Sequence, residues 1–359
     1  MLAQIHYPQY LTSQELDGYL EQGWFRMGQS IFTTNFLNFK DQLYSAVWLR
    51  VLLDDYVDDS LYQKLIKQNA SFRVEIGRAS VTEEGETLYA AYKQSISFNA
   101  SASLHQLLYG KSTLTDIYDT HEIKLYDEDR LIAIGYFDLG KSSAAGISSF
   151  YDPAYKKYSL GKYLIYLKMD YCRKMKLQYF YPGYFAPGYP AFDYKLSMGK
   201  QALQYFQLKS GQWLTINKFS QEEAPLQMMK TKLESVQILL AAHNLRFKFY
   251  KYEFFDANLV PDLKGVEVFD FPVFLYGTDD LENLIGPIII FDVRDQQYHV
   301  IRCYSLWRSD LTPPSSEIYV GHLLKIHQFV FSTDSSDDIV AMLLKEFKSQ
   351  MPTQNTAFN

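Results

Sequence analysis

The segment YFYPGYFAPGYPAFDYK, residues 179–195, gathers five tyrosines, three phenylalanines, three prolines and two glycines ahead of an acid and a lysine. A tyrosine presents an apolar ring with a hydroxyl at its tip, which suits the wall of a cleft. Proline and glycine weaken strand pairing, so a strand here is expected to run into an open loop. We interpret these residues as the lining of a pocket; the alternative is that the rings only fill a core.

A second candidate lies upstream, where Tyr158-Ser159-Leu160-Gly161-Lys162 joins a predicted strand to a predicted helix. Such a turn leaves backbone N–H groups pointing outward at the positive end of the helix dipole. That geometry binds a phosphate or an oxyanion. An ordinary capping turn has the same sequence features, so the segment by itself leaves both interpretations open.

The residues from Tyr151 to Lys176 include seven basic residues and only two acids, Asp152 and Asp170. The whole protein has a formal net charge of −6, so no global positive field attracts nucleic acid. A solvated helix face usually explains such a run. Beside the aromatic segment it also suits a nucleic-acid end, with phosphates on lysines and unstacked bases on tyrosines. The seven basic residues are Lys156, Lys157, Lys162, Lys168, Arg173, Lys174 and Lys176.

Other site classes are excluded by composition and motif. Cys172 and Cys303 are the only cysteines, which excludes a multi-cysteine metal cluster and fits a reducing cytoplasm. The seven histidines are dispersed, and HExxH, G-x-S-x-G and Walker motifs are absent. The first residues lack a signal-peptide pattern and no run of eighteen apolar residues occurs. We therefore expect a cytoplasmic protein with no bound metal and no membrane partner.

The elements that must position these residues are clearest in the middle of the chain. Three strands, at 121–126, 130–140 and 143–153, precede a helix at 159–176 and a strand at 177–184. We predict one βββαβ unit that begins with an antiparallel meander. Ser159 is the predicted N-cap of its helix.

Further elements flank this unit. A helix is predicted at 13–23 with Ser13 as its N-cap, and an extended segment at 43–53. From residue 205 strands alternate with helices, and a last helix is predicted at 335–350. The fold class expected is α+β. The predicted division is an N-terminal region at 1–100, a core at 101–204 and an additional α+β domain of unknown role at 205–359.

Four motifs occur in order and with matching spacing: Phe150-Tyr151-Asp152-Pro153, Ser159-Leu160-Gly161 with Tyr163, Tyr181 with Gly183-Tyr184, and Phe192-Asp193-Tyr194-Lys195. Together they resemble the C-terminal half of the aminoacyl-tRNA–protein transferases, which comprise the arginyltransferases and the related bacterial leucyltransferases. A fainter likeness includes LEQGWFRMGQSIF and ASVTEEGETLYAAY, so the resemblance covers about residues 15–200.

Two departures from the family pattern stand out. Family members usually carry a cysteine cluster, associated with a metal or iron–sulfur centre, where this chain has TTNFLNFKDQLYSAVW. No iron–sulfur or zinc cluster, and no other cofactor, is therefore expected. Phe192 stands where the family has methionine, a change that conserves bulk.

The resemblance implies a GNAT-like mixed sheet with flanking helices, an N-terminal α/β region and a C-terminal α+β extension. It implies that an aminoacyl-tRNA ester is the donor and that the α-amino group of a protein beginning with Asp or Glu is the acceptor. Direct attack requires a neutral amine near the ester carbonyl, donors for the developing oxyanion and a proton acceptor.

Residue roles follow from the resemblance. The expected catalytic residues are Asp152, Tyr181, Asp193 and Lys195. The expected substrate-binding residues are Arg26, Arg50, Tyr151, Ser159, Leu160, Gly161, Lys162, Tyr163, Gly183, Tyr184 and Tyr194. The cations Arg26, Arg50 and Lys195 are expected to meet the acidic acceptor residue. Asp152 as a turn residue, Arg50 in a structural ion pair and Tyr181 in the core are the alternatives.

Three hypotheses for function remain. The first is an arginyl- or leucyl-type transferase without the cysteine cluster. The second is an acyl-CoA N-acyltransferase on the same fold, against which the lack of a glycine-rich pyrophosphate loop argues. The third is a non-catalytic binder of protein N-termini or tRNA.

Overall fold

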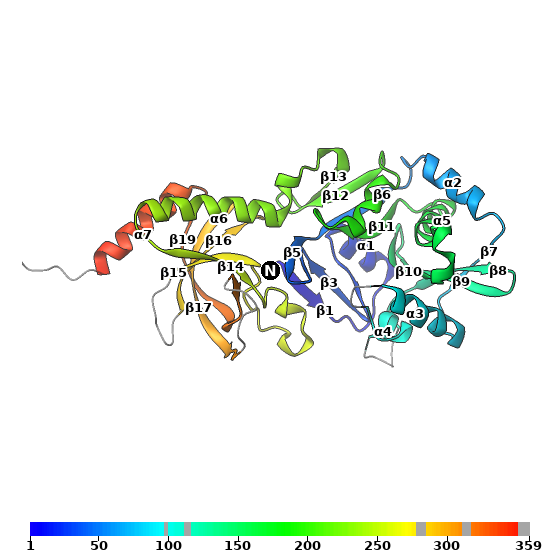
Figure 1. Cartoon of the computed structure of the whole chain (residues 1–359), viewed down its shortest axis with the longest axis horizontal. Helices are drawn as coiled ribbons and strands as arrows, with labels where there is room; N and C mark the ends of the chain where they lie inside the picture. Colours follow the sequence, from blue (N-terminus) through cyan, green and yellow to red (C-terminus); the bar gives the residue numbers. More distant parts are fainter. Residues whose placement is uncertain (97–99, 111–115, 278–284, 311–316, 351–359) are drawn as a thin grey trace, which may run out of the picture.

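The computed structural model describes residues 1–96, 100–110, 116–277, 285–310 and 317–350. Two lobes lie side by side along the long axis of the molecule, with the N-terminus between them (Figure 1). The larger lobe is built on an eight-stranded sheet and the smaller lobe on a six-stranded sheet. Within the described residues, no helix has the length and apolar character needed to cross a membrane.

The sheet of the larger lobe has the order β13-β12-β6-β11-β10-β9-β8-β7. All neighbouring strands are antiparallel except β10 and β11. The predicted βββαβ unit is confirmed as β8, β9, β10, α5 and β11. The strands are β6 (Val47–Leu52), β7 (Arg73–Arg78), β8 (Thr120–Asp127), β9 (Arg130–Leu139), β10 (Ser143–Tyr151), β11 (Tyr179–Phe185), β12 (Leu203–Gln207) and β13 (Gln212–Thr215).

The parallel pair β10 and β11 separates soon after it starts. Pairing covers only Ser143–Ala145 against Tyr179–Tyr181. Beyond it, β11 shifts register against β6 between Phe180 and Gly183, and Pro182 has no N–H to donate. Gly183 has a φ of +88°, in the left-handed region that favours glycine. The sheet therefore opens at its centre, which confirms the expected GNAT-like α+β architecture.

Helices cover both faces of this sheet. Ala144 and Phe180 pack with α5 (Leu160–Lys174) and α2 (Ser60–Gln68). Their neighbours Ala145 and Tyr181 pack with α1 (Ser13–Glu21), because consecutive strand residues point to opposite faces. Helices α3 (Glu83–Ser95) and α4 (Leu104–Tyr109) add a further cluster around Tyr136 and Phe150.

The N-cap of α1 is Thr12 rather than the predicted Ser13. Thr12 and Glu15 form a capping box, in which each side chain bonds the backbone of the other residue. The prediction was one residue late because both residue types favour the position. This helix packs beside a small sheet of order β1-β3-β2, made of β1 (Ala3–His6), β2 (Phe25–Met27) and β3 (Ser30–Thr34).

The segment TTNFLNFKDQLYSAVW, residues 33–48, contains a hairpin of β4 (Phe36–Phe39) and β5 (Gln42–Ser45). The ring of Phe39 lies 5.0 Å from that of Tyr189 and 6.0 Å from that of Phe192. The hairpin thus packs against the loop that follows β11, using aromatic contacts.

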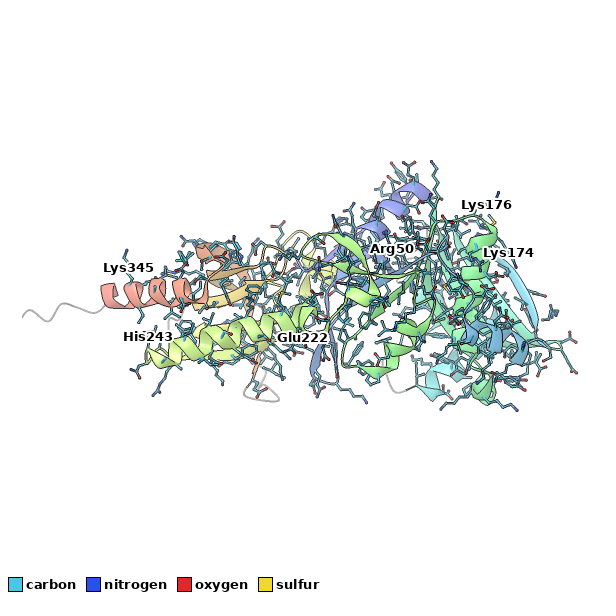
Figure 2. The ribbon with its side chains drawn as sticks, turned by 90° about the horizontal axis from the view of Figure 1, so that it is seen from above. Arg50, Lys174, Lys176, Glu222, His243 and Lys345 are labelled. Carbon is cyan, nitrogen blue, oxygen red and sulfur yellow. The ribbon has the colours of Figure 1, made fainter. Side chains whose placement is uncertain are left out.

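The smaller lobe has the sheet order β18-β14-β15-β16-β17-β19. Its main helix is α6 (Pro225–Ala242), which runs from near Glu222 to His243 (Figure 2). Buried α6 residues recur every three to four positions, so one stripe faces the sheet. The other elements are β14 (Phe247–Tyr252), β15 (Val273–Gly277), β16 (Ile285–Asp292), β17 (Gln297–Arg308), β18 (Ile318–Tyr319), β19 (His322–Thr333) and α7 (Ser336–Gln350).

Short 3-10 helices connect these elements. They are η1 (Pro153–Tyr158), η2 (Pro190–Ser197), η3 (Ile216–Lys218), η4 (Gln221–Glu223), η5 (Ala257–Leu259) and η6 (Pro261–Leu263). Strand β19 was not predicted from the sequence. Strands of the eight-stranded sheet come from all three predicted segments of the chain, since β12 spans the predicted boundary at residue 204.

The N-terminal strand ties the two lobes together. The Asp270 carboxylate in the smaller lobe accepts hydrogen bonds from the backbone N–H groups of Leu2 and Ala3. Leu2 and Phe36 are buried in the core of the smaller lobe although they precede the first strand of the large sheet. Asp270 is 4% exposed, so these bonds form away from water.

The Asp270 tie makes a prediction about stability. Asp270→Ala leaves two buried N–H groups without an acceptor and should lower the free energy of unfolding by about 2 to 4 kcal/mol. Asp270→Asn keeps one acceptor oxygen and should cost about 1 kcal/mol. Urea denaturation measures both, with the exposed Asp262→Ala as the control. Equal stabilities for Asp270→Ala and the control would contradict the assignment.

Candidate active site

A cleft of about 430 Å³ opens where β10 and β11 separate, beside the N-terminus of α5. Among the predicted site residues it collects Tyr151, Ser159, Gly161, Lys162, Tyr194 and Lys195. Phe180 and Pro182 belong to the aromatic segment that was predicted to line a pocket, and Lys156 and Lys168 belong to the basic run. The other six lining residues were not predicted, namely Tyr92, Gly146, Ile147, Ser148, Ser149 and Ile165.

The N-terminus of α5 is open toward this cleft. Ser159 has φ 55° and ψ 39°, and its hydroxyl makes no capping hydrogen bond. The prediction of Ser159 as the N-cap residue is therefore confirmed, but it caps the helix in a left-handed conformation and without a side-chain hydrogen bond. The N–H groups of Leu160 and Gly161 have no acceptor among the described residues, so they remain available to an anion.

Lysines give the cleft its charge. Lys156, Lys162, Lys168 and Lys195 line it, and no carboxylate does within the described part of the chain. The ammonium of Lys162 lies 5.8 Å from the ring centroid of Tyr194. In a protein of net charge −6, this arrangement makes a local site for anions.

Lys195 stands at the mouth of the gap between the strands. Its Nζ donates a hydrogen bond to the Tyr184 carbonyl at 2.7 Å and lies 5.2 Å from the Phe192 ring. Burial lowers the pKa of this lysine to about 8. The group is half-buried, so it is a cation near neutral pH that a ligand can still reach.

Lys168 lies beneath the cleft and is only 1% exposed. Its Nζ donates to the carbonyls of Tyr136 and Ser148, both at 2.9 Å, and to Ser149 Oγ at 3.0 Å. Tyr136 and Ser148 face each other across β9 and β10 at a bulge. A Cβ at Gly135 would lie 2.8 Å from Lys168 Cε, so glycine is needed there.

The sequence analysis counted Lys168 within an exposed basic run, and that interpretation is wrong for this residue. Lys168 lies four positions after Leu164 and eight after Leu160, on the buried stripe of α5. This spacing was the signal that distinguished it from its basic neighbours. Burial lowers the pKa of Lys168 to about 7.

Tyrosines form the aromatic wall of the cleft. The rings of Tyr92 and Tyr151 lie 5.6 Å apart. Burial raises the pKa of Tyr194 to about 12, so its hydroxyl stays protonated at neutral pH. The wall therefore offers flat rings for stacking and neutral hydroxyls for hydrogen bonds.

A second hollow of about 250 Å³ lies on the opposite face of the sheet, beside Phe25 and Trp48. The cleft and this hollow share Gly146, Ile147, Pro182 and Lys195, so they meet at the gap between β10 and β11. Three predicted site residues line the hollow rather than the cleft, namely Arg26, Gly183 and Tyr184.

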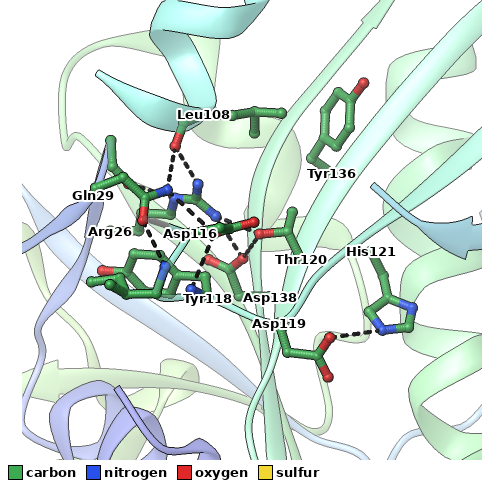
Figure 3. A network of polar contacts seen from close by, with 12 residues as sticks. Arg26, Gln29, Leu108, Asp116, Tyr118, Asp119, Thr120, His121, Tyr136 and Asp138 are labelled. Atoms are coloured by element: carbon green, nitrogen blue, oxygen red, sulfur yellow. Dashed lines mark hydrogen bonds and ion pairs between the residues drawn. The ribbon is translucent and has the colours of Figure 1, made fainter. Parts of the chain in front are cut away.

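Arg26 is held by a network at the wall of this hollow (Figure 3). Its guanidinium donates to Asp138 Oδ1 at 2.8 Å, to Thr120 Oγ1 at 2.7 Å and to two backbone carbonyls. The side chains of Arg26 and Asp138 are 4% and 1% exposed. Burial raises the pKa of Asp138, against the opposing effect of Arg26. Asp138 lies 112 positions from Arg26 in the sequence, and no local pattern predicted that the two would pair.

Several predicted site residues lie outside both hollows. Asp152 caps η1 through the Ala154 N–H at 2.9 Å and pairs with Arg130. Asp193 is exposed on η2. Tyr181 is 1% exposed, and its ring lies 5.4 Å from Trp213.

Three more predicted site residues, Arg50 and two residues of α5, lie outside the cleft and the hollow. Arg50 donates to Gln204 at 2.7 Å, and its guanidinium is 4.3 Å from the Tyr179 ring and 4.7 Å from the Trp213 ring. Leu160 and Tyr163 are buried in the core between the sheet and α5.

The residues that line the cleft lie within the part of the chain that matches a known family. The family model described as "Arginine-tRNA-protein transferase, C terminus" matches residues 84–205. An aspartate/glutamate leucyltransferase of Leptospira interrogans is 29% identical over 54% of this chain and 77% of its own length. A Vibrio cholerae protein of the same name is 27% identical over 53% of this chain and 79% of its own. Among solved structures, FemX is 10% identical with a TM-score of 0.33, covering 51% of this chain and 64% of its own.

Burial of Lys168 makes a prediction about pH. Its pKa is about 7 in the folded protein and near 10.5 in the unfolded chain. Between these values the unfolded chain binds more protons, so Lys168 makes the protein more stable as pH rises. Relative to Lys168→Met, wild-type stability should therefore rise by about 2 kcal/mol from pH 7 to pH 9.

Urea denaturation at pH 7, 8 and 9 checks this slope. The exposed Lys200→Met is the matched control and should follow the wild type at every pH. A constant difference between wild type and Lys168→Met would show that Lys168 keeps its proton throughout this range.

Proposed function

Since this chain belongs to the aminoacyl-tRNA–protein transferase family, we propose that it moves an amino acid from aminoacyl-tRNA to the α-amino group of a protein that begins with Asp or Glu. One observation carries the proposal. The cleft has four lysines, no lining carboxylate among the described residues and the open N-terminus of α5. Three of these lysines, Lys156, Lys162 and Lys195, can face a ligand, because Lys168 is buried and bonded to backbone carbonyls.

The donor enters this cleft by its 3′ end. Phosphates meet Lys156, Lys162 and the free N–H groups of α5, while unstacked bases pack on Tyr151 and Tyr194. Aromatic rings and cations can bind a single-stranded end by themselves, so a helix that enters the groove of a duplex is not required.

The reacting ester lies at the gap between β10 and β11. The amine nitrogen attacks the ester carbonyl carbon, and the ribose oxygen leaves with a proton as the amide forms. Lys195, at the junction of the two hollows, supplies a cation for the negative charge that develops on the carbonyl oxygen. Its hydrogen bond to the Tyr184 carbonyl holds the ammonium in place.

The cleft favours an apolar amino acid over a cationic one. Ile147, Ile165, Phe180 and Pro182 provide apolar surface beside the gap. An arginyl group would meet lysines without a lining carboxylate to pair with it. We therefore favour leucine as the transferred amino acid, in agreement with the names of the relatives.

A direct transfer assay tests the proposal. Purified protein is incubated with tRNA charged with labelled leucine or arginine and with a peptide that begins with Asp. Label should move from leucyl-tRNA to this peptide, and little should move from arginyl-tRNA. A peptide that begins with Ala and an N-acetylated Asp peptide are the controls. Absence of transfer from either tRNA would contradict the function; efficient arginine transfer would contradict the preference for leucine.

Donor binding makes a second prediction. Lys162→Ala removes one cation at the cleft and should lower affinity for tRNA, reducing the slope of log K against log salt by about 1. Lys345→Ala, in the smaller lobe far from the cleft, is the matched control (Figure 2). Fluorescence anisotropy over a salt series measures the slope. An unchanged slope in Lys162→Ala would place the tRNA elsewhere.

A further inference from the structure

The hollow on the far face of the sheet is lined by three charged residues, Arg26, Asp138 and Lys195, and the last two have the charges that an acidic N-terminal residue requires. Such a residue carries an α-ammonium and a side-chain carboxylate within a few bonds of each other. The hollow offers Asp138 on one wall and Lys195 on another. It also opens at the gap in which the ester lies, since four of its lining residues belong to the cleft as well.

One oxygen of Asp138 is unsatisfied. Its Oδ1 accepts from Arg26 at 2.8 Å and from Thr120 at 2.7 Å, whereas its buried Oδ2 has no hydrogen-bond partner among the described residues. Leaving a buried carboxylate oxygen unpaired costs free energy in most settings. Here the side chain belongs to the wall of a hollow, so a donor can come from a ligand.

We propose, on the basis of the transferase function above, that this hollow binds the acceptor's N-terminal residue and that Asp138 receives the proton of its α-ammonium. Oδ2 binds the α-ammonium. The Lys195 ammonium has two N–H groups beyond the one bonded to the Tyr184 carbonyl, so it can meet the acidic side chain with one and the ester oxygen with the other. Arg26 and Thr120 are positioning residues that hold Asp138 through Oδ1. The donor and the acceptor thus approach the gap from opposite faces of one sheet.

Asp138 carboxylate and the α-ammonium become a carboxylic acid and a neutral amine. The amine forms a bond to the ester carbonyl carbon, the bond from that carbon to the ribose oxygen breaks, and the second amine proton goes to the ribose oxygen. Asp138 then returns its proton to solvent. Burial raises the pKa of Asp138, which brings it closer to that of the amine.

The charged and titratable groups around Asp138 come from several elements. Arg26 is on β2, Asp116 and Tyr118 precede β8, and Lys168 lies on α5. Arg26 and Asp116 have opposing effects on the pKa of Asp138, and burial remains the largest influence.

The experiment compares wild type with Asp138→Asn. Binding of an Asp-initiated peptide, measured by calorimetry, should weaken at least tenfold in Asp138→Asn. The transfer rate should fall about a hundredfold or more at pH 6.5. That defect should shrink to less than tenfold at pH 9, because a free α-amino group with a pKa near 8 is then neutral without help. A purely structural role would give a defect that does not change with pH.

Glu122→Gln is the matched control. Glu122 is also buried, on the neighbouring strand β8, and its Oε2 also has no partner among the described residues, but it does not line the hollow. The control should leave peptide binding within threefold of wild type. Peptide binding by Asp138→Asn equal to that of the wild type, or a defect constant from pH 6.5 to pH 9, overturns the proposal.

Two outcomes separate this site from the transferase function. If wild type binds the Asp peptide and transfers nothing, the function fails while the site stands. If Asp138→Asn does not fold, the proposal is tested on the wild type alone by comparing its affinities for two peptides. It should bind the free-amine peptide at least tenfold more tightly than the N-acetylated one, and equal binding overturns the proposal.

Discussion

The early separation of β10 and β11 is the constraint on which the site depends. Two parallel strands that stayed paired would close the sheet and leave nowhere for an ester to lie. Pairing ends after Ala145 and Tyr181, and at Pro182 and Gly183 the strand β11 shifts its register against β6. The cleft, the hollow behind it and the reach of Lys195 into both follow from this opening.

Buried cations stabilise the opened geometry. Lys168 binds the carbonyls of Tyr136 and Ser148 at the bulge of β10, close to the point where that strand leaves β11. On the other face of the sheet, Arg26 holds Asp138 in place through a hydrogen bond. Each cation is desolvated and fully engaged, so its contribution lies in fixing the strands more than in binding ligand. The buried cations thus stabilise the strands below the cleft, and the lysines at its surface are available to bind a ligand.

In the segment after β11, some aromatic rings line the cleft and others pack against a hairpin. Tyr194 lines the cleft, whereas Tyr189 and Phe192 pack against Phe39 of the hairpin β4–β5. Aromatic ring contacts therefore connect the hairpin to the loop of the candidate site.

The sequence by itself determined the βββαβ unit, the lysines and tyrosines around the start of α5, and the opening at Pro182-Gly183, because these features depend on local patterns within about 75 residues. It did not predict β19 or identify Asp138. Tertiary structure alone paired Arg26 with Asp138, buried Lys168 and moved Asp152, Tyr181 and Arg50 out of the cleft. The physical reason is that the partner and solvent exposure of a charged side chain depend on strands that are distant in sequence.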